Sequence, residues 1–237
     1  FLMLPGILLT LVFRYFPMYG AIIAFKDYNP MLGILDSPWV GFEHFREFIS
    51  SPNFGMLLSN TLKISIYGLI LGFFPPIILA LSLNQVLNEK IKKKLQLILY
   101  APNFISVVVI VGMLFLFLSA NGPINSIVQK LTGNPIMFMS SPDYFRTIYI
   151  LSGIWQGIGW SSILYTATLA GVSTDLYEAA NIDGANLIQK IWHIDLPAMR
   201  PIMVISFILS AGNIMNVGYE KAYLMQTSMN IPASEII

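Results

Sequence analysis

The sequence predicts an all-α integral membrane protein, a polytopic bundle of helices. Hydrophobic residues make up 56% of the 237 residues and charged residues only 11%, whereas a soluble domain has about 25% charged residues. Several apolar runs are long enough to cross the hydrocarbon core, which takes about 20 residues of helix. Because the sequence begins inside an apolar run and ends at Ile237 with no tail, we expect residues 1–237 to be a single transmembrane domain in a fragment truncated at both ends.

Five long stretches carry few or no charges and are the expected spans. The first is interrupted only by Arg14. The turn signal Asn121-Gly122-Pro123 ends the third, and a short interfacial helix, Ile124–Leu131, should follow it. The expected spans cover about residues 1–25, 57–88, 95–119, 147–170 and 201–220. This number would leave the two ends on opposite sides, so we expect a sixth span beyond Ile237.

Prolines and glycines divide these spans further. Pro75-Pro76 should break or kink the second span, and Pro102 the third. The pairs Gly68/Gly72 and Gly153/Gly157 allow helices to approach closely. Alternatively, they mark a hinge or an unwound segment that lines a pathway.

The connections predict which side each loop occupies. Four lysines lie among the six residues Glu89–Lys94, and the positive-inside rule places this short loop in the cytoplasm. Alternation then places residues 26–56 and 120–146 outside and the loop of residues 171–200 inside. The outer segment 26–56 mixes aromatic and charged residues, which is typical of an interfacial loop with a short amphipathic helix at about Glu43–Ile49.

The second cytoplasmic loop is longer than two antiparallel helices need. Asp175 should cap a first helix over Leu176–Asp183, and Gly184 should end it in the left-handed conformation. A second helix over about residues 185–194 should stop before Pro197. From these residues alone, a linker lying on the membrane surface is an equally good interpretation.

One motif in this loop resembles the EAA-loop signature of the permease subunits of binding-protein-dependent ABC importers. The signature is Glu-Ala-Ala, three residues, Gly, nine residues and Ile-x-Leu-Pro, and every anchor is present at its spacing: Glu178, Ala179, Ala180, Gly184, Ile194, Leu196 and Pro197. Further segments are similar to the sugar-uptake branch, and most of all to its oligosaccharide or polysaccharide permeases: Leu4-Pro5-Gly6, residues 14–20, Asn60-Thr61, residues 100–106 and residues 216–220.

The resemblance implies a type I ABC importer permease fold in the bacterial plasma membrane. The chain would form half of the translocation pathway for a sugar or oligosaccharide. Its partners would be a second permease subunit in a heterodimer, a cytoplasmic ABC ATPase dimer, an extracytoplasmic solute-binding protein and the lipid bilayer. The ATPase would dock on Glu178, Ala179, Ala180, Asp183 and Gly184, while Ile194, Leu196 and Pro197 would fix the loop to the fifth span.

No catalytic or nucleotide-binding pattern is present in the chain itself. There is no G-x-x-x-x-G-K-[ST] P-loop, so ATP would be used by the partner ATPase and no cofactor bound here. The two histidines form no H-E-x-x-H, and there is no G-x-S-x-G and no cysteine. We expect no enzymatic activity and no metal site. The net charge of +1 also argues against binding of nucleic acid.

A sugar pathway needs hydroxyl and amide partners together with flat apolar faces. The candidates in the fourth and fifth spans are Trp155, Gln156, Trp160, Tyr165, Asn213 and Asn216. The two asparagines are three residues apart and would share one helical face. The alternative is that the aromatic residues belong to the interfacial belt and the asparagines bond between helices.

Three alternative functions remain at this stage. An ABC importer permease for another solute class, such as amino acids or lipid-linked sugars, would share the EAA loop. A secondary transporter would need intramembrane acids for ion coupling, and the second to fifth spans contain none up to Tyr219. A membrane-embedded enzyme is disfavoured by the missing catalytic groups.

Overall fold

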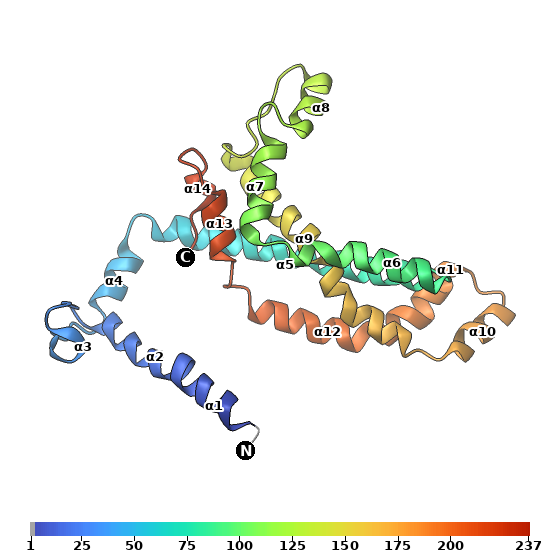
Figure 1. Cartoon of the computed structure of the whole chain (residues 1–237), viewed down its shortest axis with the longest axis horizontal. Coiled ribbons are helices and arrows are strands. Elements are labelled where there is room, and N and C mark those ends of the chain that lie inside the picture. The colour runs from blue at the N-terminus through green and yellow to red at the C-terminus, as the bar shows by residue number, and fades with distance from the viewer. Residues whose placement is uncertain (1–2) are drawn as a thin grey trace. The chain divides into compact units, whose positions relative to one another are not determined.

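The computed structural model describes residues 3–237, and every named element in that range is a helix (Figure 1). The only β-pairing among these residues is an isolated bridge between Lys26 and Trp39. The all-α prediction is therefore confirmed. The chain divides into two compact units, residues 1–55 and 56–237, which are described separately.

The first unit begins with one continuous helix, Leu4–Phe25. It consists of α1 (Leu4–Thr10), a π turn η1 (Leu11–Tyr15), α2 (Phe16–Met18) and a 3₁₀ segment η2 (Tyr19–Phe25). This helix matches the first expected span. It is followed by α3 (Gly33–Asp36) and by α4 (Glu43–Ser50), which confirms the short helix expected over residues 43–49.

The second unit contains all but the first two residues of α5 (Phe54–Asn84), a single helix of 31 residues. Pro75 and Pro76 lie inside it, and the helix continues through both. The sequence predicted a break or a kink at these prolines, and the prediction of a break is therefore wrong. A proline removes one intrahelical donor, and transmembrane helices tolerate that loss when surrounding groups satisfy the carbonyl left behind.

The third expected span, residues 95–119, is wrong as a single helix. The structure has α6 (Glu89–Tyr100), a 3₁₀ turn η3 (Ala101–Phe104) and α7 (Val107–Leu118). Pro102 lies in the turn, and the side chain of Ser106 caps α7 by accepting from the Val109 N–H at 3.4 Å. The break expected at Pro102 is thus confirmed. So is the short helix that follows, α8 (Pro123–Thr132).

The helix α9 (Pro142–Ala170) covers the fourth expected span and extends it by five residues at its start. It packs against α6 at Gly159, where there is no room for a side chain. A Cβ atom there would lie 2.1 Å from the Leu99 carbonyl oxygen. The two backbones can approach this closely only because residue 159 is glycine.

The last long helix covers Leu187–Gly212, so the fifth expected span, residues 201–220, is wrong at both ends. It combines α11 (Leu187–Lys190), a π turn η4 (Ile191–Asp195) and α12 (Leu196–Gly212). The chain then leaves the helix and forms α13 (Tyr219–Met225) and α14 (Ile231–Ser234).

The predicted stop before Pro197 is also wrong, because the π turn carries the helix past the proline. Proline has no N–H, and its ring meets the carbonyl four residues earlier in a regular α-helix. Here the Leu196 N–H bonds to Ile191, five residues back, and Pro197 occupies the first turn of α12. The same arrangement occurs in the first unit, where η1 directly precedes the segment with Pro17.

Four helices within residues 3–237 are long and apolar enough to span a membrane. They are Leu4–Phe25, Phe54–Asn84, Val107–Thr132, which runs from the start of α7 to the end of α8, and Leu187–Gly212. The 29-residue α9 is long enough but is not among them. Five spans are therefore not confirmed.

Two clusters of buried side chains hold the second unit together. One joins α5, α7, α9, α13 and α14, and its members include Ile64, Val111, Phe145 and Met225. The other joins α5, α9 and α12 through Ile77, Ala80, Tyr165, Leu169 and Met199. Because Ile64 and Ile77 both lie on α5, the clusters pack against different lengths of the same helix.

Three fully buried asparagines fix the irregular segments around the first cluster. The Asn60 amide donates to the carbonyls of Pro232 and Glu235 at 3.0 and 2.9 Å. The Asn125 side chain holds the chain on both sides of α8, and that of Asn230 donates to Met139 at 2.9 Å. Buried carbonyls without partners would be costly, so these amides make the loop conformations possible.

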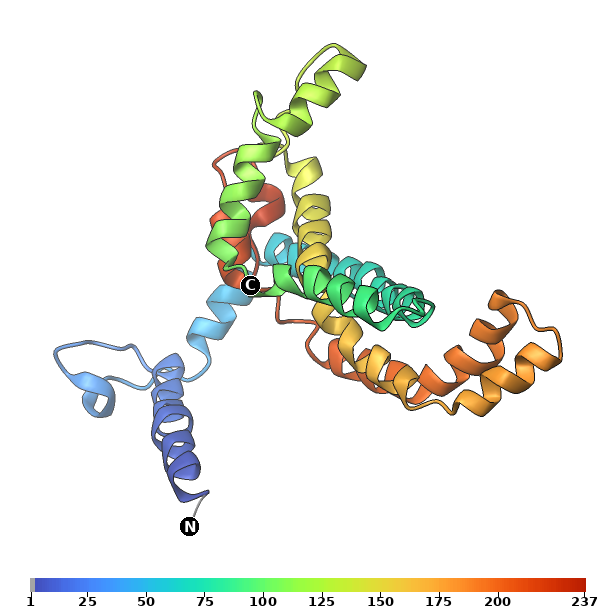
Figure 2. The ribbon, with the colours of Figure 1, turned by 45° about the vertical axis from the view of Figure 1, so that its right-hand side comes forward.

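Helix α8 lies at one end of the second unit, and α10 (Thr174–Ile182) lies at another. Both views of the ribbon show this separation (Figure 2). The turn between α5 and α6 lies at the same end as α10, since the Asn84 side chain donates to the Tyr177 hydroxyl at 3.4 Å. The lysine-rich start of α6 is therefore near α10.

Candidate functional site

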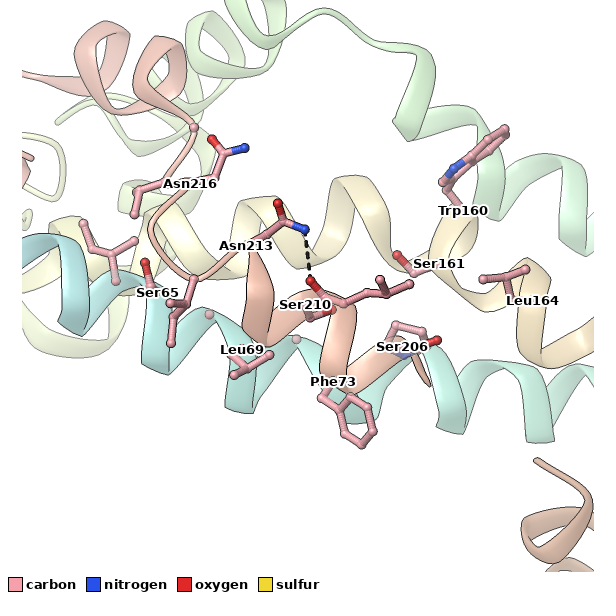
Figure 3. A pocket seen from close by; sticks show the side chains of 18 of the residues that line it. Ser65, Leu69, Phe73, Trp160, Ser161, Leu164, Ser206, Ser210, Asn213 and Asn216 are labelled. Carbon is pink, nitrogen blue, oxygen red and sulfur yellow. Dashed lines mark hydrogen bonds between the residues drawn. The ribbon is translucent and has the colours of Figure 1, made fainter. Parts of the chain in front are cut away.

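A cavity of about 870 Å³ lies between α5, α9, α12 and the segment that follows α12 (Figure 3). It is bounded by residues of both buried clusters, such as Ile64 and Tyr165. Its polar lining consists of serine hydroxyls and asparagine amides: Ser65, Ser161, Ser206, Ser210, Asn213 and Asn216. Its aromatic lining consists of Phe73, Tyr149, Trp160 and Tyr165.

Four of the six residues proposed from the sequence for a pathway line this cavity: Trp160, Tyr165, Asn213 and Asn216. The other two do not. Trp155 lies on the outer face of α9 with 47% of its surface exposed. The Gln156 amide donates to the Ile105 carbonyl at 3.1 Å and thereby holds the break between α6 and α7.

The two asparagines line the cavity for a different reason from the one expected. Helix α12 ends at Gly212, so the prediction that they share a helical face is wrong. The Asn213 amide donates to the Leu209 carbonyl at 3.0 Å and closes the last turn (dashed line in Figure 3). The chain then turns through Asn216, whose N–H bonds to the Asn213 carbonyl at 2.9 Å. The cavity wall here is an unwound segment.

Helix α5 supplies one wall, although none of the six pathway candidates named from the sequence lies on it. Ser65, Gly68, Gly72, Phe73 and Pro76 all face the cavity. A Cβ atom on Gly68 would meet nothing within 4 Å, so this glycine leaves space open instead of admitting a neighbouring helix. Gly153 and Gly157 border an adjoining hollow of about 290 Å³. In the sequence, only the glycine pairs Gly68/Gly72 and Gly153/Gly157 had indicated that these helices border an open space.

A buried cation lies against α9, beside the adjoining hollow. Lys221 is only 8% exposed, and its ammonium donates to the Tyr149 carbonyl at 3.0 Å and lies 4.8 Å from the centre of the Tyr149 ring. Burial lowers the pKa of Lys221 to about 8. A Cβ on Gly153 would come within 3.3 Å of this ammonium, so only a glycine separates it from the hollow. Its position in the sequence gave no sign of this burial.

The second candidate site is the coupling segment, residues 173–197. Ser173, not Asp175, caps α10, since its hydroxyl accepts from the Asp175 N–H at 3.2 Å. The helix starts earlier than expected because Ser173 already has the extended conformation that a cap requires. Gly184 has φ +74°, which confirms the left-handed corner, and the Ala185 N–H closes it by bonding to Ala180 at 2.8 Å.

Beyond the corner, Asn186 begins the next helix with a capping box. Its side chain accepts from the Gln189 N–H at 2.9 Å, and the Gln189 side chain accepts from the Asn186 N–H at 2.7 Å. Two caps thus set the directions of the helices on either side of Gly184. The segment is a rigid helix, corner and helix, and its second arm continues directly into α12.

The residues of the EAA motif differ in exposure. Glu178, Ala179, Asp183, Gly184 and Pro197 are exposed, while Ala180, Ile194 and Leu196 are half-buried. Several apolar neighbours on the segment are also exposed, among them Ile182 at 87%, Ile188 at 66% and Trp192 at 64%. Exposed large apolar side chains on one short segment are typical of an interaction site.

Neither region has the composition of a metal site. Within residues 3–237, no three His, Asp or Glu side chains come together. His193 lies on the coupling segment, exposed, with its Nδ1 2.9 Å from the Gln189 carbonyl.

Comparison with known proteins agrees with the EAA motif. Residues 72–219 match the family described as "Binding-protein-dependent transport system inner membrane component". The chain is 42% identical over 236 residues to protein LplB of Bacillus subtilis, covering 99% of this chain and 74% of that protein. The identity and coverage are the same for the polygalacturonan/rhamnogalacturonan transport system permease protein YteP of Bacillus subtilis.

The solved structures point the same way. The crystal structure of a bacterial ABC transporter involved in the import of the acidic polysaccharide alginate matches with a TM-score of 0.89 and 35% identity, covering 99% of this chain and 79% of that one. The alginate transporter in complex with an alginate pentasaccharide-bound periplasmic protein matches with a TM-score of 0.88. The chain therefore belongs to the family of binding-protein-dependent transport system inner membrane components, and it is a multi-pass permease subunit of an ABC importer in the bacterial plasma membrane.

Proposed function

We propose that this permease imports an oligosaccharide and that the cavity between α5, α9 and α12 is the part of the pathway where the sugar binds. The observation that carries the proposal is the composition of the cavity wall. The wall combines the hydroxyls of Ser65, Ser206 and Ser210 and the amide of Asn213 with aromatic side chains. Sugars present hydroxyl groups around the ring edge and C–H groups on its faces, and such a wall provides partners for both.

The size of the cavity also fits this proposal. A volume of about 870 Å³ lies near the upper end of small-molecule sites, which enclose roughly 300–1,000 Å³. The cavity is therefore larger than a single sugar ring needs. YteP is named for the transport of polygalacturonan and rhamnogalacturonan, and the alginate transporter is described as importing an acidic polysaccharide. Both names favour an oligosaccharide over amino acids or lipid-linked sugars as the solute.

Backbone groups of α5 add to the polar wall. Pro76 has no N–H and cannot donate to the carbonyl of Gly72, its usual helical partner. Both residues line the cavity. A sugar hydroxyl could therefore donate to this carbonyl, which is consistent with an interrupted hydrogen-bond ladder at membrane depth lining a polar pathway.

The coupling segment is proposed to lie in the cytoplasm and to bind the ATPase subunit, which would hydrolyse the ATP. Its exposed apolar residues, Ile182 and Trp192, would be covered by this partner. The lysine-rich start of α6 lies near it, and such loops remain in the cytoplasm. Glu178, Ala179, Ala180, Asp183 and Gly184 would form the docking surface, and Ile194, Leu196 and Pro197 would join it to α12.

The remaining partners follow from the same proposal. A second permease subunit would complete the pathway as a heterodimer, and an extracytoplasmic solute-binding protein would deliver the sugar. The alginate transporter solved with its periplasmic protein is a structural precedent for this assembly. The permease itself would bind no cofactor and catalyse no reaction.

Uptake by the reconstituted importer tests this function. The full-length protein and its partner subunits would be placed in proteoliposomes with ATP on the ATPase side. Labelled oligogalacturonate and labelled malto-oligosaccharide, each presented with a cognate binding protein, would be compared with labelled amino acids. We expect ATP-dependent accumulation of an oligosaccharide. Accumulation of amino acids alone, or uptake of any solute without ATP, would contradict the proposal.

A further inference from the structure

A carboxyl group is completely buried where the coupling segment joins α12. Asp195 has no exposed surface and lies at the end of the π turn η4. Within residues 3–237, no lysine or arginine forms a salt bridge with it. Burying a carboxyl group is costly unless hydrogen bonds replace its hydration, so the groups around Asp195 hold it in place.

Those groups come from two other segments of the chain. The Tyr177 hydroxyl donates to Asp195 Oδ1 at 2.5 Å, and the Gln85 amide lies 3.5 Å from Oδ2. The Asn84 amide in turn donates to the Tyr177 hydroxyl at 3.4 Å. Burial and the bond to Asp195 raise the pKa of Tyr177 to about 12, so the phenol keeps its proton and remains the donor at neutral pH.

The four residues join three elements with different roles. Tyr177 immediately precedes Glu178 of the EAA motif on α10, and Asp195 immediately precedes Leu196 at the start of α12. Asn84 is the last residue of α5. Helices α5 and α12 are two of the walls of the cavity. The cluster therefore connects the proposed docking helix to both walls at once.

Few other contacts tie α10 to these walls. The helix packs only sparsely against the rest of the second unit. A side-chain hydrogen bond from Lys190 to Asn181 stays within the coupling segment, and the backbone bonds around Gly184 close the corner itself. A force on α10 can thus reach α5 through the Tyr177 hydroxyl.

We propose that Tyr177, Asp195, Asn84 and Gln85 form a coupling cluster that transmits displacement of α10 to α5 and α12. The inference rests on the proposed function, because it assumes that the ATPase binds α10. It assigns these residues a role distinct from docking. The exposed motif residues bind the partner, whereas the buried cluster passes the movement on. The cavity walls would then switch between two arrangements, and the position of α10 would determine which of the two is adopted.

The test is the number of sugar molecules imported per ATP hydrolysed. Tyr177→Phe removes a single oxygen atom and keeps the ring. We expect about a tenfold lower ratio of uptake to ATP hydrolysis, since loss of a hydrogen bond to an acidic group shifts a two-state equilibrium by at least that much. The ATPase should still co-purify with the variant. Tyr223→Phe is the matched control, because that hydroxyl makes no hydrogen bond within residues 3–237 and its ring is 62% exposed.

A second variant keeps the inference testable on its own. Asp195→Asn should lower the same ratio, and the double variant should be no worse than the more affected single variant, since both break one connection. A wild-type ratio in Tyr177→Phe would overturn the inference. So would loss of ATPase binding, which would make Tyr177 a docking residue. A wild-type complex that hydrolyses ATP without importing any oligosaccharide would instead refute the proposed function.

Discussion

At the scale of single residues, the cavity wall depends on a side chain that also ends a helix. Asn213 donates to the last turn of α12, and it lines the cavity beside Ser210. An amide has two N–H donors and a carbonyl acceptor, so the bond to Leu209 leaves further hydrogen-bonding capacity for a sugar hydroxyl. The residue therefore combines a structural and a proposed binding role.

We predict that Asn213→Leu lowers oligosaccharide uptake roughly tenfold, the cost of leaving one polar partner unpaired. The assembly of the importer should be unchanged. Asn134→Leu is the matched control, since Asn134 is exposed and does not line the cavity. Initial uptake rates and co-purification of the ATPase measure the two effects. Full uptake by Asn213→Leu would leave this asparagine with the capping role alone.

Gly184 sets the corner of the coupling segment through its backbone conformation. An added Cβ would meet nothing within 4 Å, so any substitution acts through the left-handed φ of +74°. A residue other than glycine pays about 1–2 kcal/mol there, and a β-branched residue is especially disfavoured.

We predict that Gly184→Val lowers uptake at least tenfold, because the two arms of the coupling segment change direction, while membrane insertion stays normal. Gly133→Val is the matched control: Gly133 also has a left-handed φ, +85°, and open space around it, but it ends α8 far from the coupling segment. Equal uptake by the two variants would show that the corner is not part of coupling.

At the scale of elements, two features of the helices decide where the walls of the cavity lie. The π turn η4 carries one continuous helix past Pro197, which links the coupling segment rigidly to α12. Gly159 brings the backbone of α9 against that of α6, and this contact positions the turn of α9 that carries Trp160. Both features depend on backbone geometry.

The close approach at Gly159 makes a prediction for stability. Gly159→Ala should destabilise the protein by about 1–3 kcal/mol, the usual cost of overpacking, because its methyl group would collide with the Leu99 carbonyl. Gly157→Ala, two residues away on the same helix, meets nothing within 4 Å. It should be neutral or stabilise by roughly 0.5–1 kcal/mol. Thermal unfolding in detergent compares the two; a lower Tm for Gly157→Ala than for Gly159→Ala would contradict the packing described here.

At the scale of the second unit as a whole, the cavity occupies the space between two buried clusters. Both clusters pack on α5, so a change in the position of α5 must alter both ends of the cavity. The coupling cluster lies at one end of this helix, and the Asn60 network that holds residues 232–237 lies at the other. This arrangement suits a helix that transmits movement.

The proposed sidedness can be checked directly because the sequence contains no cysteine. Ile182→Cys, on the coupling segment, should react with a membrane-impermeant maleimide only in inverted vesicles. Asn134→Cys, after α8, should react in intact spheroplasts. Both positions are exposed, so burial within this chain cannot explain a lack of labelling. Labelling of Ile182→Cys from outside would invert the proposed topology.

Much of this protein could be predicted from the residues alone, since the determining interactions are local. The scarcity of charge and the long apolar runs indicated a helical membrane protein. Local rules also predicted the break at Pro102, the corner at Gly184 and the short helices at about residues 43–49 and 124–131, which the structure extends to 43–50 and 123–132. The EAA spacing, a contiguous pattern, identified the family.

Only the tertiary structure decided the features that depend on segments far apart in the chain. Hydropathy cannot show that α12 ends at Gly212 or that a π turn carries the chain past Pro197. Nor could the sequence assign Gln156 to the Ile105 carbonyl instead of the cavity, or bury Lys221 and Asp195. Each of these outcomes depends on which backbone group or side chain a distant segment presents, and packing alone determines that.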